Sequence, residues 1–524
     1  MHKPEDDFHR CLIDAMSSGA FYDHPVSDVT LIETHISWVF LAGDFAYKVK
    51  KPLDFGFLDF STLAKRKFCC EEEVRLNRRL APEIYLDVVA IGGDDNGLCL
   101  NGRPTREYAV KMRRFDQPQQ LDEMLRAGRL SAEKMDCFAE VMAEFHDRAL
   151  VADPSSHFGT AEVVYAPVAQ NFYQIRSHLP DGELEEQVTR LEIWSRTAYE
   201  RLQSMLTQRK VQGFIRECHG DAHLANMAWY HDAPVFFDCI EFNADLRWID
   251  VMNEVAFLVM DLDDRGRQDL GWRCLNRYLE KTGDYAGGVV LTFYKVYRAL
   301  VRAKVACLRL AQSGLTDVER AADMALVRSY LNLAEGYAQP RQAQLIITHG
   351  LSGSGKSTFV NDLAPQLGAL CLHSDHERKR LFGLAMDEQS HSVVEGGIYS
   401  ADAGTRTYAR LYDLADTLLS AGLTTIVDAT FLKQQARERF RQLAQRHQVA
   451  LTVLDFSVPE AELRRRIRRR TEQGTAVSEA GEDVLDVQIA ADEPLAESEK
   501  QGCLEITPQT ELQQIVKQLR PRQT

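Results

Sequence analysis

The clearest chemical signal in this 524-residue chain is a glycine-rich stretch that ends in lysine, serine and threonine. It consists of Gly350, Leu351, Ser352, Gly353, Ser354, Gly355, Lys356, Ser357 and Thr358, and it directly follows a predicted strand. Such glycines let backbone N–H groups turn inward around phosphates, the lysine reaches the outer phosphates, and the serine hydroxyl can ligate Mg²⁺. The spacing therefore predicts a loop that binds a nucleoside triphosphate with Mg²⁺.

A carboxylate and a guanidinium follow the next apolar segment. Asp375 comes just after residues 370–373, the expected end of a strand, and Arg378 stands one helical turn further on. This spacing puts both side chains on one face, where Asp375 can deprotonate an acceptor hydroxyl and Arg378 can hold a phosphate or carboxylate. The alternative is an aspartate that caps a helix, followed by a surface arginine.

Two further features complete the predicted C-terminal site. Asp428 ends a short apolar strand, as a carboxylate that holds the Mg²⁺ shell would. On a helix, Leu463 and Ile467 share an inward face that Arg466 and Arg470 flank. Either arginine could close over a transferring phosphoryl group, and nucleic-acid binding is the rival interpretation of this arginine run.

A second polar cluster lies between strand-like segments near the middle of the chain. Asp221, Asn226 five residues later and Asp238 beyond a turn offer a base and two metal-ligand oxygens, as phosphoryl transfer requires. A metal site using His219 and His223, four residues apart, is the alternative. It is disfavoured because zinc pairs of this kind normally lie on a helix with a glutamate between them, and Gly220 and Asp221 stand there instead.

The elements that must position these residues divide the chain in two. A hairpin is expected over residues 32–50, a helix over 61–80 with Ser61 as its N-cap, and strands over 86–91 and 106–115. Residues 131–333 are expected to be mostly helical, apart from a strand-like segment rich in polar residues at 218–242, which we call the polar island. After about residue 340 short apolar strands alternate with helices, which is typical of a parallel sheet covered by helices. We therefore predict domains at 1–338 and 339–524.

Composition limits the classes of function. A formal net charge of -15 argues against non-specific affinity for nucleic acid or anionic membrane, although it leaves a local basic site open. The 11 cysteines show no paired spacing, and no apolar run is long enough to span a bilayer. These features favour a soluble, cytoplasmic protein with no membrane partner; its oligomeric state stays open.

The C-terminal motifs together resemble the small P-loop kinases that include zeta toxins, chloramphenicol phosphotransferases, gluconate kinases and polynucleotide kinases. The resemblance covers residues 341–524 and implies an α/β P-loop NTPase fold with a parallel sheet. It also implies that Asp375, after the second strand, activates the acceptor hydroxyl. Acceptors in this family range from sugars to nucleic-acid ends, so the substrate is not implied.

The N-terminal motifs resemble the aminoglycoside phosphotransferase and choline kinase families, over residues 25–310. The resemblance implies an α+β protein-kinase-like fold, with Lys48 as the lysine that holds the nucleotide phosphates and Glu73 as its partner. Residues 108–112 resemble the hinge strand against which adenine packs. The chain departs from protein kinases in having Cys239 and Ile240 after Asp238 and in lacking a glycine-rich loop, which leaves a non-catalytic domain as an alternative.

The combined hypothesis is a fused double phosphotransferase, resembling bifunctional aminoglycoside phosphotransferase/ATP-binding proteins. Each site would use ATP and Mg²⁺ to phosphorylate a hydroxylated small molecule such as a sugar or amino sugar, with Asp221 and Asp375 as bases. One alternative is a P-loop switch that regulates a silent kinase-like domain. Another is phosphorylation of nucleotides or nucleic-acid ends.

Overall fold

The computed structural model describes residues 4–54, 56, 58–94, 97–179, 182–312, 314–340, 342–386, 388, 396–473 and 481–520. The chain forms two compact units, each built from two segments. Unit 1 comprises Met1–Pro167 and Gln203–Leu258, and unit 2 comprises Val168–Leu202 and Val259–Thr524.

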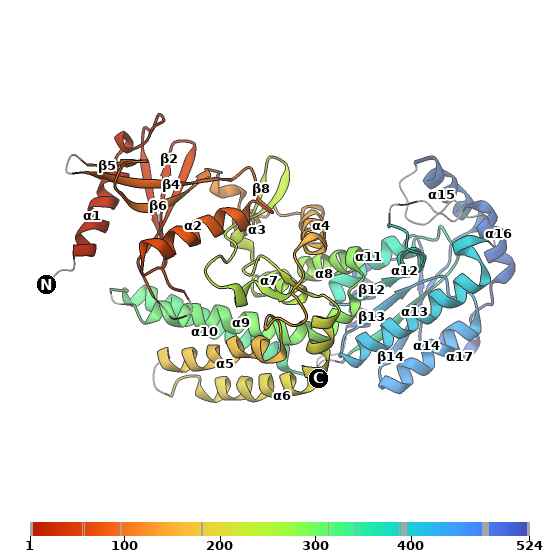
Figure 1. Cartoon of the computed structure of the whole chain (residues 1–524). Helices are drawn as coiled ribbons and strands as arrows, with labels where there is room; N and C mark the ends of the chain where they lie inside the picture. Colours follow the sequence, from red (N-terminus) through yellow and green to blue (C-terminus); the bar gives the residue numbers. More distant parts are fainter. Residues whose placement is uncertain are drawn as a thin grey trace. The chain divides into compact units, whose positions relative to one another are not determined.

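Unit 1 begins with an antiparallel six-stranded sheet in the order β1-β2-β3-β6-β4-β5 (Figure 1). Its strands are β1 (Val29–Glu33), β2 (Ser37–Ala42), β3 (Phe45–Lys50), β4 (Tyr85–Asp94), β5 (Gly97–Leu100) and β6 (Thr105–Arg113). The expected hairpin is confirmed as β2 and β3. Helix α2 (Leu63–Asn77) packs against β4 and β6. Its N-cap is Thr62, whose hydroxyl accepts the Lys65 N–H, so the prediction of Ser61 was wrong by one residue.

The rest of unit 1 is mostly helical around short strands, as expected. It contains α1 (Pro4–Met16), α3 (Leu121–Arg126), α4 (Ala132–Arg148), β7 (Ile215–Glu217), β8 (Met227–Tyr230), β9 (Ala233–Phe236) and β10 (Trp248–Asp250). Strand β7 pairs with β10, and β8 pairs with β9 in a hairpin. Three helices have residues in both units: α5 (Ala161–His178), α6 (Glu185–Val211) and α7 (Val251–Asp264). The predicted polar island therefore consists of two small strand pairs and their loops.

Unit 2 contains a five-stranded parallel sheet in the order β12-β13-β11-β14-β15. Its strands are β11 (Gln344–His349), β12 (Leu370–His373), β13 (Thr425–Asp428), β14 (Ala450–Phe456) and β15 (Cys503–Ile506). Strands β12 and β13 are buried along their whole length, as strands covered on both faces must be. The predicted parallel sheet, and with it the two-part fold class, is confirmed.

Helices cover this sheet (Figure 1). They are α11 (Lys356–Leu367), α12 (Ser374–Leu381), α13 (Ala401–Ser420), α14 (Gln434–His447), α15 (Glu460–Gln473), α16 (Glu482–Ala491), α17 (Glu497–Lys500) and α18 (Leu512–Leu519). Residues of α11 and α18 share one apolar core with β11 and β13, and α13 contacts β11, β12 and β13.

Three more helices belong to unit 2: α8 (Gln268–Thr282), α9 (Gly288–Leu310) and α10 (Asp317–Ala338). Helices α9 and α10 pack along each other, α8 packs against α11 and β12, and α9 contacts α13. The predicted boundary between residues 338 and 339 falls between α10 and β11, and it stays a prediction. Within the described ranges no helix is long and apolar enough to cross a membrane.

Candidate active sites

A buried charge network surrounds the lysine predicted to hold nucleotide phosphates. Lys48 on β3 donates from Nζ to Glu73 Oε1 of α2 at 2.9 Å and also contacts Asp238. Lys50 lies two residues on, so the alternation of a strand places it on the same face, where it contacts Glu73 and Glu241. Both lysines therefore share Glu73, although sequence reasoning chose only Lys48.

The charges in this network stabilise one another. Burial raises the pKa of Glu73, but Lys48 and Lys50 outweigh it and lower that pKa to about 2. Burial likewise lowers the pKa of Lys48, while Asp238 and Glu73 raise it well above its ordinary value. Lys48 is thus a fixed cation at neutral pH, which is what phosphate binding requires.

The predicted base Asp221 lies in the loop after β7. Its Oδ2 accepts a hydrogen bond from Asn226 Nδ2 at 2.9 Å, and the same amide donates to the Asp221 carbonyl at 3.0 Å. His223 Nε2 lies 3.4 Å from Asp221 Oδ2. The Asp221 side chain is 34% exposed, so it is oriented by its neighbours and accessible to an acceptor.

Asp238 adopts a backbone conformation that side chains rarely take. Its φ is +63°, and its N–H donates to the Tyr85 hydroxyl at 3.0 Å. The adjacent Phe237 N–H donates to the Asn226 carbonyl at 3.0 Å, which holds the two loops together. A non-glycine residue at positive φ persists where surrounding contacts enforce it, often at functional sites. The oxygens of Asn226 and Asp238 are the hard donors that Mg²⁺ prefers.

His219 does not fit the alternative metal site. Its Nε2 lies 2.9 Å from the Phe237 carbonyl, and its Nδ1 lies 3.3 Å from the Asp221 N–H. Burial lowers the pKa of His219, so the ring is neutral, with Nε2 as donor and Nδ1 as acceptor. Because both nitrogens are hydrogen-bonded, His219 shapes the loop and leaves no nitrogen for a metal.

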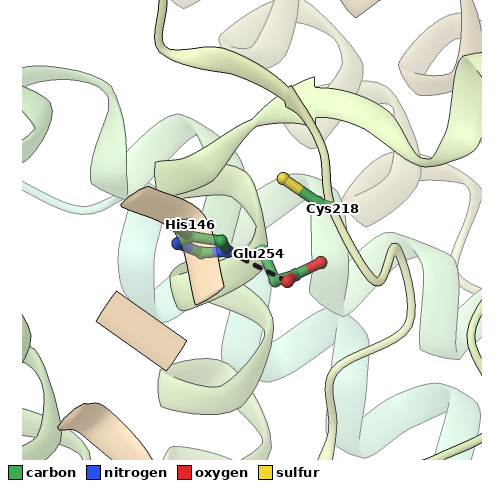
Figure 2. A group of neighbouring side chains, drawn as sticks. All are labelled: His146, Cys218 and Glu254. Atoms are coloured by element: carbon green, nitrogen blue, oxygen red, sulfur yellow. Dashed lines mark hydrogen bonds and ion pairs between the residues drawn. The ribbon is translucent and has the colours of Figure 1, made fainter. Parts of the chain in front are cut away.

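Three buried side chains that the sequence did not predict lie close together next to this loop (Figure 2). His146 of α4, Cys218 and Glu254 of α7 are buried, with ligand-type atoms within 4.8 Å of one another. Glu254 accepts the Gly220 N–H at 2.6 Å and contacts His146 Nε2 at 3.0 Å, and burial raises the pKa of the Cys218 thiol. We interpret the group as a support for the loop that carries Asp221, since both Glu254 oxygens are used and the sulfur stays protonated.

Gly220 needs to be glycine at this point. Its φ is +88°, and a Cβ there would lie 2.8 Å from the Leu246 carbonyl oxygen. Glycine alone adopts this conformation freely. The close approach lets the Gly220 N–H reach Glu254.

The nucleotide-binding loop of unit 2 joins β11 to α11. Gly350, Gly353 and Gly355 have φ values of +138°, +82° and +93°, so the loop turns as the motif predicts. Lys356 Nζ donates to the carbonyls of Gly350 at 2.9 Å and Leu351 at 2.8 Å. The lysine therefore points into the loop, where phosphates would replace the carbonyls as partners.

The remaining loop residues differ in their surroundings. Ser352 pairs with Gln488 of α16, whose Oε1 accepts the Ser352 N–H at 2.8 Å and whose Nε2 donates to the Ser352 hydroxyl at 2.9 Å. Ser354 is buried, and its hydroxyl lies 3.3 Å from Lys356 Nζ. Thr358 is exposed on the first turn of α11. Its nucleotide-binding role stays a prediction.

Asp428 ends β13 beside this loop. Its Oδ2 accepts the Ser357 hydroxyl at 2.6 Å and lies 2.9 Å from His373 Nδ1. Burial raises the pKa of Asp428, but His373, Lys356 and Ser357 lower it below its ordinary value. The Ser357 hydroxyl and the Asp428 carboxylate thus form an oxygen donor set suited to Mg²⁺.

Asp375 and Arg378 lie on α12, directly after β12. Arg378 Nη1 donates to Asp375 Oδ1 at 2.8 Å. The N-cap of α12 is His373, so Asp375 is not a capping residue. In the parallel register His373 is opposite Asp428, and Asp375 follows His373 by two residues.

The arginine helix α15 brings Arg466 to the loop. Arg466 Nη1 lies 3.4 Å from the Ser354 carbonyl and 3.5 Å from that of Gly353. Arg466 also pairs with Glu462, and its neighbours pair with carboxylates too: Arg464 with Glu460 and Asp486, Arg465 with Glu462, and Arg468 with Glu482. This pairing weakens the nucleic-acid interpretation. The Arg470 side chain lies outside the described residues.

The fold and both sites define a chain that joins a protein-kinase-like α+β fold to a P-loop kinase fold. The AAA domain family matches residues 345–495. Two proteins described as uncharacterised, from Mycobacterium tuberculosis (strain ATCC 25618 / H37Rv) and Mycobacterium bovis (strain ATCC BAA-935 / AF2122/97), are 33% identical over 431 residues. The match covers 82% of this chain and 84% of each relative. The chain belongs to the family of these mycobacterial proteins.

Solved structures with similar folds match the two parts separately. Amicoumacin kinase hAmiN, in complex with AMP-PNP, Ca²⁺ and Ami, is 12% identical, with 63% of this chain and 96% of that chain covered and a TM-score of 0.41. A gluconokinase from Sinorhizobium meliloti 1021 is 20% identical, with coverages of 34% and 89% and a TM-score of 0.25. At these values the likeness concerns fold alone. The assignments above rest on strand order and on the motifs.

Proposed function

We propose that this chain is an ATP-dependent phosphotransferase with two kinase-type sites, each acting on a hydroxyl group of a small molecule such as a sugar or amino sugar. The observation that carries the proposal is the contact of Lys48 with both Glu73 and Asp238. A lysine paired with a helix glutamate beside a metal-binding aspartate is the arrangement that phosphoryl transfer needs. It favours an active N-terminal site over a silent one.

In unit 1 each predicted residue has a role that its surroundings support. Lys48 binds nucleotide phosphates, while Asn226 and Asp238 supply oxygens for the divalent ion. Bound Mg²⁺ would neutralise charge on the phosphate oxygens. Asp221, oriented by Asn226 and partly exposed, takes the proton of the acceptor hydroxyl.

In unit 2 the same tasks fall to different elements. The backbone N–H groups of the loop and Lys356 bind the phosphates, and Ser357 with Asp428 holds the ion. Asp375 is the base. Arg378 and Arg466 lie where they can balance charge on the transferring phosphoryl group.

A nucleotide-driven switch is the second candidate for unit 2. It is favoured by the packing of α8 against α11, the helix that follows the nucleotide-binding loop, and of α9 against α13. A switch should keep its response to ATP when Asp375 is replaced, whereas a kinase should lose phosphoryl transfer.

The test is a metabolite extract incubated with ATP and the full chain, with mass spectrometry for products that gain one phosphoryl group. Asp221→Asn and Asp375→Asn should each abolish one set of products and spare the other. Asp402→Asn, an aspartate on α13 whose side chain is 82% exposed, is the matched control and should keep both sets. Product formation that neither active-site variant reduces would contradict the proposal.

A further inference from the structure

Helix α8 covers the open edge of the parallel sheet in unit 2. Strand β12 is the edge strand at one end of the sheet. The side-chain amide of Asn276 on α8 acts both as donor and as acceptor for backbone groups at the start of this strand. Asn276 Nδ2 donates to the Ala369 carbonyl at 2.9 Å, and Asn276 Oδ1 accepts the Cys371 N–H at 2.8 Å. The amide thus satisfies backbone groups that an edge strand otherwise leaves unpaired.

The next turn of the same helix reaches the nucleotide site. Glu280 follows Asn276 by four residues, so both side chains lie on one helix face. Its Oε1 contacts His373 Nε2 at 3.3 Å, and His373 Nδ1 lies 2.9 Å from Asp428 Oδ2. Glu280, His373 and Asp428 are all at least 90% buried. A continuous line of contacts therefore runs from α8 to the carboxylate that pairs with Ser357.

This line constrains the Asp428 carboxylate. His373 and Ser357 meet at the same oxygen, Oδ2, so the His373 ring fixes how the carboxylate faces the ion-binding position. Glu280 Oε1 lies 3.3 Å from the opposite ring nitrogen, at ion-pair distance, so a turn of the ring would separate His373 from both carboxylates. Partners behind metal ligands act in this way, and their removal costs about 10- to 100-fold in metal affinity or activity.

We propose that Glu280 is a positioning residue for the P-loop site: it holds His373, and through it Asp428, so that α8 helps to set Mg²⁺ affinity there. The inference rests on the proposed function only in assigning Ser357 and Asp428 to the ion. Glu280 lies outside the region that the AAA domain family matches, so the site is completed from beyond that domain.

The test is binding of a fluorescent ATP analogue to the full chain, with and without Mg²⁺. Every protein carries Lys48→Met, which removes nucleotide binding at the unit 1 site. Glu280→Gln should raise the Mg²⁺ concentration for half-maximal enhancement about tenfold and leave metal-free nucleotide affinity unchanged. The matched control is Asp269→Asn, which neutralises a carboxylate at the far end of α8, where it pairs with Arg267. It should change neither quantity.

A double-mutant cycle separates positioning from packing. If Glu280 acts through His373, the variant with both Glu280→Gln and His373→Asn should match His373→Asn alone, whereas independent packing effects would add. Should Glu280→Gln fail to fold, Glu280→Asp, which keeps the charge and withdraws it by one methylene group, replaces it with the same expected shift.

The outcomes separate this inference from the proposed function. A shifted Mg²⁺ dependence without any phosphorylated product supports the positioning role and contradicts the kinase proposal. Product formation with an unshifted Mg²⁺ dependence in Glu280→Gln, additive effects in the cycle, or no Mg²⁺ enhancement in the Lys48→Met reference protein overturns the positioning role.

Discussion

The two candidate sites hold the lysines proposed to bind phosphates in different ways. In unit 1, Lys48 lies between carboxylates contributed by α2 and by the loop after β9. In unit 2, Lys356 donates to backbone carbonyls of its own loop. A lysine buried among carboxylates is part of the fold's charge balance, whereas a lysine held by carbonyls can exchange them for phosphates locally. Charge removal should therefore affect both stability and nucleotide affinity in unit 1, and mainly nucleotide affinity in unit 2.

The largest effect should be a loss of the phosphoryl-transfer rate, and it should be similar in both units. It tests whether the two different folds catalyse the same kind of reaction. Replacing the base, by Asp221→Asn or Asp375→Asn, should slow transfer at that site by about 10²- to 10⁴-fold, because the acceptor hydroxyl loses its proton acceptor. Steady-state kinetics with each site's acceptor gives the rates, and nucleotide binding should be unchanged. A loss of binding that matches the loss of rate would show a structural role for the aspartate.

Lys50→Met should show the difference between the two units most clearly, as a loss of stability in unit 1. The variant leaves Glu73 and Glu241 buried with one cation fewer, and breaking a buried pair in this way costs about 3–5 kcal/mol. Lys356→Met, the control, should lower the free energy of unfolding far less and abolish nucleotide binding in unit 2. Urea unfolding with hydrogen exchange of β3 and α2 as the local readout distinguishes them. Equal destabilisation would contradict the comparison.

Glu254→Gln tests whether the Glu254 carboxylate supports the loop that carries Asp221. Its effect on the free energy of unfolding should depend on pH. Burial raises the pKa of Glu254, but His146, His219 and the Gly220 N–H lower it to about 2 from 4.5. Because the pKa of Glu254 is lower in the folded state than in the unfolded state, its ionised carboxylate stabilises the fold above about pH 4.5. This contribution is lost as the pH falls towards 2. The shift corresponds to about 3 kcal/mol at neutral pH.

Denaturant unfolding across pH should show the Glu254→Gln deficit shrinking as the solution becomes acidic. The control Glu144→Gln changes an exposed glutamate of α4 and should differ little from wild type at any pH. A deficit that stays constant from pH 7 to pH 3 would mean that the carboxylate charge is not what supports the loop.

The smallest effect should separate two neighbouring arginines of α15. Arg466→Ala should weaken ATP binding in unit 2 by a few-fold to tenfold, because its guanidinium lies beside the loop carbonyls. Arg465→Ala, whose side chain is 77% exposed and pairs only on the surface, should leave binding unchanged. Calorimetry measures the ATP affinity of both variants. An equal loss of affinity in the two would mean that the overall positive charge of α15, and not the position of Arg466, affects ATP binding.

Local motifs allowed much of this to be predicted from the sequence. The loop at Gly350 and the strand-end Asp428 each follow from a spacing within neighbouring elements, and the pairing of Lys48 with Glu73 follows from the resemblance to kinase families. The parallel sheet followed from short apolar runs between helices. These are short-range patterns, which can be recognised without knowing how distant parts of the chain pack.

The supporting residues could not be predicted, because long-range packing brings them together. His146 and Glu254 are 108 residues apart, and Glu280 meets His373 across 93 residues without any shared motif. The resemblance to kinase families points to Lys48 alone. Lys50 lies on the same face of β3, because side chains two residues apart on a strand point to the same side. Tertiary contacts, rather than propensity, also explain why α8 covers β12.

The most direct test of two nucleotide sites in one chain is the stoichiometry of ATP binding by calorimetry in the presence of Mg²⁺. The full chain should bind two equivalents, Lys48→Met and Lys356→Ala should each bind one, and the double variant should bind none. A single equivalent in the unmodified chain, abolished by one lysine substitution and untouched by the other, would contradict the account.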